Sequence, residues 1–191
     1  MGYAPGGRLF RKWNVPGNAA GSPDGVFAEQ MFEGIDPEIY PNYSLRGSNY
    51  GFTAADIQES ATVTGIEVRV TRFANKSSGG APNVKDAWVY LVGATGTLGA
   101  GTDLGSSENW ATSIEQKIYG SPTTLAGQSF TPADITNSNF GVLLGVQRSS
   151  SGDEGTATFA SVDAIEIRVH YTVPGASPGG RKGLLFSFFG G

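Results

Sequence analysis

The chain has 191 residues, enough for one domain with a sizeable core and some additional chain. Its 29 glycines and 10 prolines favour turns over long helices, since both residues are poor in helix interiors. The formal net charge of −4 argues against a basic nucleic-acid-binding surface, and the absence of cysteine excludes disulfides, thiolate metal sites and cysteine nucleophiles.

Two further classes are disfavoured by the sequence. No N-terminal apolar run resembles a signal peptide, and no window is long enough to span a membrane. The largest basic cluster, Arg8 with Arg11 and Lys12, is small and is interpreted as part of a solubilised arm. We therefore expect neither nucleic acid nor a membrane as a partner.

Residues 1–42 show no clear period and are interpreted as an extended N-terminal arm that lies on its own domain or on a neighbour. Five prolines interrupt this segment, yet it carries more aromatic side chains than a solvated linker usually does. The arm residues expected to bind a partner are Phe10, Trp13, Phe27 and Phe32. Residues 26–33 are predicted to form two helical turns, with Asp24 as the cap.

Residues 43–173 are predicted to form one all-β domain, an antiparallel, jelly-roll-like β-sandwich of about eight strands. Apolar and polar residues alternate most clearly where Ile165, Ile167 and Val169 share one strand face. The main predicted strands are 64–73, 86–92, 112–119, 140–146 and 162–173, with weaker candidates at 43–53, 59–63, 125–131 and 156–159. Short helical turns are expected at 53–57 and 131–136, each beginning with a threonine cap.

Residues 174–191 are predicted to be a glycine- and proline-rich linker followed by an apolar C-terminal tail. Five large apolar side chains left in water at the end of such a tether would promote aggregation. We therefore expect them to pack on the parent domain or in a groove of a neighbour, and the flexible tether favours the neighbour. These tail residues are Leu184, Leu185, Phe186, Phe188 and Phe189.

No motif in the chain predicts an enzyme, a metal site or a cofactor. The glycine-rich segment 93–99 follows a strand, as a dinucleotide-binding loop does, but more glycines follow it where a helix would have to begin. His170 is the single histidine, and its place beside Glu166 and Arg168 on a strand indicates a solvated or ion-paired side chain. Nothing in the sequence brings two carboxylates together for acid–base catalysis.

Three aromatic residues suggest an alternative function. Trp88 and Tyr90 share one face of a predicted strand, and with Trp110 they could form a platform on which sugar rings stack. The same residues would equally fit a covered sheet face or a contact between subunits. A carbohydrate-binding module for glycan or host-surface attachment is therefore kept as the second hypothesis.

Several short pieces occur in a set order and spacing within residues 43–172. These pieces are Asn49-Tyr50-Gly51-Phe52, Val63-Thr64-Gly65-Ile66-Glu67-Val68, Val84-Lys85-Asp86-Ala87-Trp88-Val89, Ile118-Tyr119-Gly120, Phe130-Thr131-Pro132-Ala133-Asp134-Ile135, Asn139-Phe140-Gly141-Val142 and residues 161–172. As a set, they resemble a domain found in structural proteins of tailed bacteriophages and in their prophage-encoded relatives. The resemblance covers about two-thirds of the chain and depends on the order and spacing of the pieces rather than on any one of them.

This resemblance implies a β-sandwich and a non-enzymatic virion component that decorates or cements the particle. Its partners would be other virion proteins, such as capsid, neck or tail subunits, and copies of itself, and it would be located in the virion after assembly in the host cytoplasm. The chain departs from the family pattern where a Trp-Gly pair is replaced by Ala126-Gly127, and it lacks a fibre-like repeat. Head, neck and tail placement all remain open.

Overall fold

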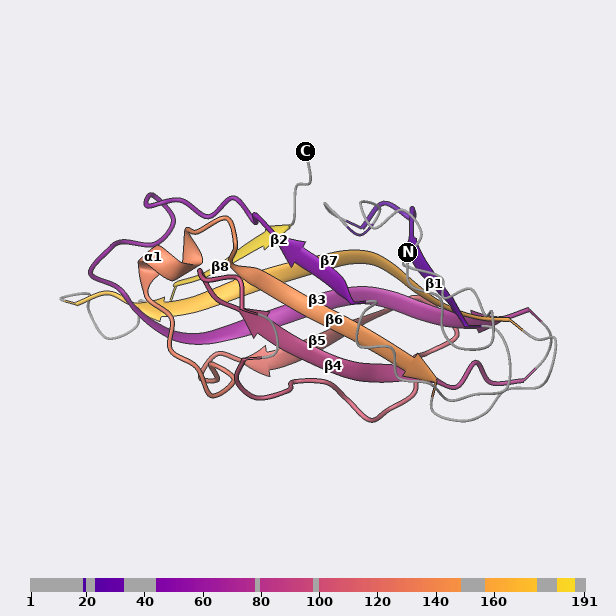
Figure 1. The fold of residues 1–191 in the computed structure, drawn as a ribbon. Helices are drawn as coiled ribbons and strands as arrows, with labels where there is room; N and C mark the ends of the chain where they lie inside the picture. The colour runs from indigo at the N-terminus through magenta and orange to yellow at the C-terminus, as the bar shows by residue number, and fades with distance from the viewer. Residues whose placement is uncertain are drawn as a thin grey trace.

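The computed structural model describes residue 19 and residues 23–32, 44–77, 80–97, 100–148 and 157–174, together with the backbone of residues 182–187. These residues form two antiparallel sheets that pack against each other, which confirms the predicted all-β sandwich (Figure 1). In this part of the chain, no helix has the length and apolar character needed to cross a membrane.

The larger sheet has the strand order β1-β7-β3-β5, and β8 also pairs with β7. The smaller sheet has the order β2-β6-β4, and every pair in both sheets is antiparallel. The larger sheet contains β1 (Ala28–Phe32), β3 (Thr62–Lys76), β5 (Glu115–Ser121), β7 (Thr158–Thr172) and β8 (Lys182–Ser187). The smaller contains β2 (Leu45–Ser48), β4 (Val84–Val92) and β6 (Gly141–Arg148).

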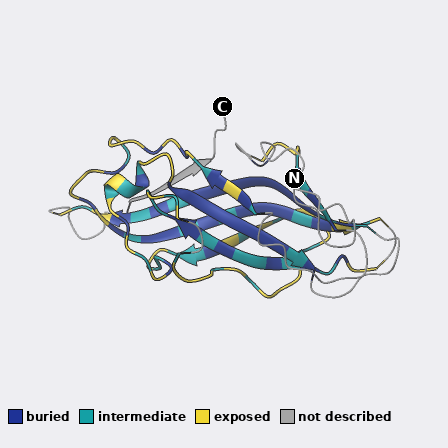
Figure 2. Cartoon of the chain, in the orientation of Figure 1, coloured by how far each residue is buried: buried dark blue, intermediate teal, exposed yellow. Residues whose placement is uncertain are grey.

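The core lies between the sheets and is built mainly by β3, β6 and β7. Val68 of β3 is paired with Ile167 of β7, and both side chains are fully buried. The predicted period-2 alternation is confirmed over 66–70 of β3 and 167–171 of β7, where buried and half-buried residues alternate. Buried residues form almost unbroken runs along β6 and β7 (Figure 2).

A bulge in β4 changes which residues face the core. Asp86 is paired with Val146, whereas Trp88 is paired with the next residue of β6, Gly145, so Ala87 is the extra residue. Asp86 is consequently buried, while Trp88 is half-buried on the outer face of the smaller sheet. After the bulge, Val89 and Leu91 are buried while Trp88 and Tyr90 are half-buried on the other face.

β1 and β8, from opposite ends of the chain, pair with the same edge of β7. Ala28 to Phe32 are opposite Val162 to Thr158, and Lys182 to Ser187 are opposite Tyr171 to Glu166. The helix predicted at 26–33 is therefore wrong. An extended backbone gains the hydrogen bonds of β7 and inserts Ala28 and Phe32 into the core, which a local helix cannot do.

The side chain of Asp163 holds the chain where it enters β1. Its carboxylate accepts hydrogen bonds from the backbone N–H groups of Asp24, at 3.1 Å, and Gly25, at 3.2 Å. Gly25 has a φ of 81°, a conformation that favours glycine. The segment ahead of β1 is thus fixed to β7, although the sequence predicted an arm extending from residue 1 to residue 42.

The remaining local predictions have mixed outcomes. The predicted turn at 131–136 is confirmed as α1 (Pro132–Ile135), where Thr131 and Asp134 form a capping box. The weak strand predicted at 125–131 is wrong, because Ala126 and Gly127 have φ values of 51° and 68° and turn the backbone. Of the candidates at 59–63 and 156–159, the last two residues of each lie in a strand, because β3 begins at Thr62 and β7 at Thr158.

We predict that Gly145→Ala destabilises the sandwich by about 1–3 kcal/mol, because a Cβ at this position would collide with the indole ring of Trp88. Urea unfolding followed by circular dichroism measures the change. Gly93→Ala is the control, since a Cβ there would meet the Phe130 ring at an ordinary 3.8 Å. Equal stability of the two variants would contradict the predicted packing.

Candidate functional site

The most highly organised group of polar side chains surrounds Arg72, inside the sandwich. Its guanidinium comes from β3, is 1% exposed, and forms an ion pair with Asp86 of β4. A second carboxylate, that of Glu115 on β5, accepts a hydrogen bond from Arg72 Nε at 3.0 Å. Arg72 therefore connects three strands that belong to both sheets.

Two aromatic rings enclose this ion pair. The guanidinium carbon lies 4.5 Å from the Trp110 ring centroid and 5.5 Å from that of Tyr119, within the range of cation–π attraction. Trp110 Nε1 donates to Asp86 Oδ1 at 2.8 Å, and the Tyr119 hydroxyl donates to Asp86 Oδ2 at 3.0 Å. That hydroxyl also accepts a short hydrogen bond from Arg72.

The cluster is arranged for stability rather than for proton transfer. Asp86 Oδ2 accepts one more hydrogen bond, from the backbone N–H of Ser106 at 2.8 Å, so both of its oxygens are fully used. Burial, followed by the charge of Asp86, raises the pKa of the Tyr119 hydroxyl far above its ordinary value, and this hydroxyl stays protonated. Such a network fixes how the two sheets are placed relative to each other.

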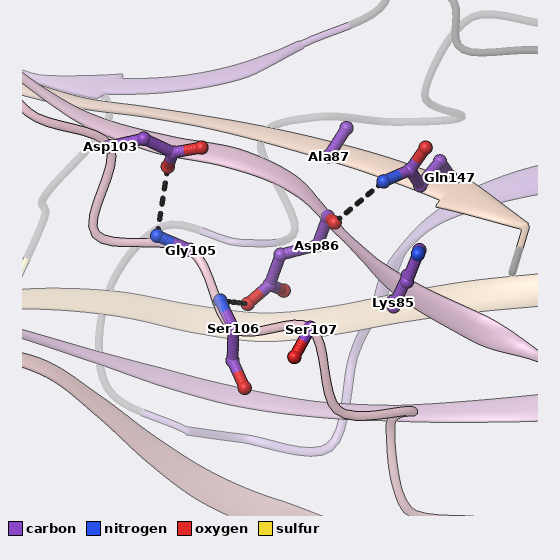
Figure 3. Close-up of a pocket in the computed structure, with 8 residues that line it drawn as sticks. All are labelled: Lys85, Asp86, Ala87, Asp103, Gly105, Ser106, Ser107 and Gln147. Atoms are coloured by element: carbon purple, nitrogen blue, oxygen red, sulfur yellow. Dashed lines mark hydrogen bonds between the residues drawn. The ribbon is translucent and has the colours of Figure 1, made fainter.

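A shallow polar pocket of about 200 Å³ lies next to this cluster (Figure 3). Asp103 contributes to its wall, but its Oδ1 atom already accepts hydrogen bonds from the backbone N–H groups of Val89 and Gly105, both at 2.8 Å. Gln147 donates to the carbonyl oxygen of Asp86 at 3.0 Å. The carboxylates of Asp103 and Asp86 thus fasten the loop after β4, while Gln147 joins β6 to β4.

The structure separates the three aromatic residues of the proposed sugar platform. Trp88 and Tyr90 are half-buried on the outer face of β4, as the alternation predicted. Trp88 Nε1 donates to Ser44 Oγ at 3.1 Å. Trp110, in contrast, is 2% exposed and belongs to the Arg72 cluster in the core, so it does not contribute to a platform on this face.

The predicted arm residues fall into two groups. Phe32 is buried in the core, and the Phe27 ring packs edge-on against Phe73 of β3 with centroids 4.9 Å apart. These two residues therefore contact their own domain. For Leu184, Leu185 and Phe186 the structure describes the backbone as part of β8, and Phe10, Trp13, Phe188 and Phe189 lie outside the described residues.

The outer face of the larger sheet carries paired charges where the sequence predicted an ion-paired histidine. His170 Nε2 lies 2.8 Å from a Glu67 carboxylate oxygen. Two residues further along β3, Arg69 forms two parallel hydrogen bonds of 2.6 Å each with Glu166. These pairs hold β3 to β7 across the sheet. No group of three or more potential metal ligands occurs within the described residues.

The sequence analysis did not single out Arg72, nor Asp86 as its partner. Arg72 sits at an inward position of β3, between Val70 and Ala74, so the alternation itself placed a charge in the core. The signal was available: Arg72 has the same parity as the buried valines. A buried arginine requires a buried carboxylate partner.

We predict that Asp86→Ala destabilises the protein by about 3–5 kcal/mol, because it leaves the buried Arg72 without its counter-charge. The double variant Arg72→Met/Asp86→Leu is expected to be markedly more stable than the single one. Chemical denaturation measures both. Lys117→Ala is the control, since its partner Glu108 is largely exposed, and it should change stability by less than about 1 kcal/mol. A mild effect of Asp86→Ala would contradict this role of the ion pair.

We also predict that stability falls as the pH rises above about 10. The pKa of Tyr119 is raised in the folded protein, so its stabilising contribution is complete below the ordinary tyrosine pKa and is lost above it. Burial raises the pKa of Tyr50 in the same direction. Tyr119→Phe should flatten the alkaline loss, whereas Tyr90→Phe on the outer face should not, as measured by thermal unfolding across the alkaline range. An unchanged profile in Tyr119→Phe would contradict the assignment.

Comparison with protein-family models, with curated protein sequences and with solved structures gives no match for this chain.

Proposed function

We propose that this chain is a non-enzymatic structural protein of a bacteriophage virion, which decorates or cements the particle through its terminal strands and sheet faces. The resemblance of residues 43–172 to tailed-phage structural proteins supports the virion context. The structure contributes a separate argument, because the elements that complete its larger sheet come from the two ends of the chain.

The observation that carries the proposal is the shared edge of β7. β1 and β8 both run antiparallel to β7 and follow one another along it, with Asp163, Ala164 and Ile165 between their paired positions. Strand addition to a sheet edge depends on backbone hydrogen bonds, so the same edge can accept a strand from its own chain or from a neighbour. This property suits an assembly unit that must be locked to adjacent subunits.

The connection to β8 has the length and composition that such an exchange needs. Ten residues separate the paired residues Tyr171 and Lys182, and glycine, proline and serine dominate them. This composition is typical of linkers, for which ten residues correspond to a root-mean-square reach of about 15–20 Å. The C-terminal strand can therefore pair with its own β7 or with that of a neighbouring copy, where symmetry repeats the contact.

The geometry supports an assembly role better than the alternatives. A sugar platform would have to rely on Trp88 and Tyr90, since Trp110 lies in the core. For an enzyme, the polar groups around Asp86 would have to be free to act on a substrate, but they are engaged in hydrogen bonds that join the sheets.

We expect purified particles of the phage or prophage that encodes this chain to contain it in many copies, as measured by quantitative mass spectrometry. Leu184→Pro/Leu185→Pro should deplete the chain from particles. The backbone N–H groups of adjacent strand residues point to opposite sides of the strand, so two adjacent prolines always remove one that pairs with β7. Ala176→Pro/Ser177→Pro, in the linker, is the matched control. Absence of the wild-type chain from particles would refute the proposal, and normal incorporation of the β8 variant would refute the role of β8.

A further inference from the structure

The opposite edge of the larger sheet is formed by β5, which pairs with β3 on one side. Among the described residues, no backbone group pairs with the other side of β5. The edge of β4 that faces away from β6, in contrast, is covered by the loop that follows β4. The backbone N–H groups of Leu104 and Trp110 in this loop donate to β4 carbonyls. β5 thus presents an uncovered row of backbone donors and acceptors.

The outward face of this strand is apolar. Ile114, just before β5, is 60% exposed and Ile118 is 56% exposed, which makes them two of the three most exposed large hydrophobic residues of the described chain. Exposed Gln116 lies between them. Proteins usually blunt an edge strand with charges, prolines or bulges, and two outward isoleucines do the opposite.

The sequence of this edge is self-complementary. Residues 114–118 read Ile-Glu-Gln-Lys-Ile, so an antiparallel copy centred on Gln116 places Ile114 opposite Ile118 of the second copy. On the other face, Glu115 then lies opposite Lys117 of the second copy. In this register, each isoleucine is opposite an isoleucine, and each charged residue is opposite a residue of the opposite charge.

We propose that β5 is a self-association edge, at which a second copy of this chain pairs antiparallel about Gln116 and extends the larger sheet across a two-fold axis. The two charged residues retain exposed surface for this contact: the Glu115 side chain is 33% exposed although it binds Arg72, and that of Lys117 is 29% exposed although it binds Glu108. The contact is isologous, so it closes as a dimer.

This inference does not depend on the proposed function, because β1 and β8 lie at the far edge of the same sheet. A pairing of five to seven residues buries less than the roughly 1,200 Å² of a standard interface. The dimer is therefore weak and concentration-dependent in solution. It gains strength where neighbouring subunits are already held together by other contacts.

Cysteine crosslinking of the full chain tests the register, because the protein has no native cysteine. Gln116→Cys places two thiols opposite each other on the two-fold axis and should give a disulfide-linked dimer under mild oxidation. Ile114→Cys and Ile118→Cys should each crosslink poorly alone but efficiently when mixed. Asn75→Cys, exposed on β3, is the control.

A second variant tests the driving force. Ile114→Thr/Ile118→Thr keeps β-branched side chains at exposed positions, so folding is preserved, and it should weaken dimerisation at least about tenfold in light scattering after size exclusion. Poor crosslinking of Gln116→Cys at concentrations where the wild type associates would overturn the inference. The inference would also be overturned if Leu184→Pro/Leu185→Pro abolished self-association and Ile114→Thr/Ile118→Thr did not. That outcome would leave the proposed function standing.

Discussion

The ion pair between Arg72 and Asp86 determines how the two sheets of this protein face each other. A guanidinium that is 1% exposed pays a large desolvation penalty unless a carboxylate compensates its charge. Asp86 supplies that carboxylate from the opposite sheet, and the β4 bulge is what turns it inward. Trp110, Tyr119 and the backbone of the following loop then satisfy the remaining hydrogen-bonding groups, so one interaction positions three strands and a long loop.

The rest of the molecule is organised around the two edges of the larger sheet. At one edge, strands from both ends of the chain complete β7 in succession, and the carboxylate of Asp163 fastens the entry to the first of them. At the other edge, no backbone group of the described residues pairs with the outer side of β5, and Ile114 and Ile118 face outward. One edge completed by strands from the two ends of the chain, and one edge open on its outer side among the described residues, are features consistent with the proposed assembly by β-strand addition.

Much of the fold could be predicted from local patterns. Apolar and polar residues alternate regularly over 66–70 of β3 and 165–172 of β7. Thr131 with Pro132 marks the start of α1 by capping chemistry that is complete within a few residues. The failures occurred where a distant partner decided the outcome. Residues 26–33 read as a helix because nothing local reveals that the edge of β7 offers them backbone hydrogen bonds and space for Phe32 in the core.

The candidate sites show the same division. The sequence by itself determined the strand periods, the turns and the self-complementary order of residues 114–118, since these depend on side chains a few positions apart. It could not show which face of each strand meets the other sheet, because alternation defines two faces but does not orient them. Only the tertiary structure turned Tyr119 inward and Ile118 outward, and placed Trp110 in the core away from Trp88. The charge of Arg72 had to be buried beside Asp86, and that requirement fixed the orientation of the strands around it.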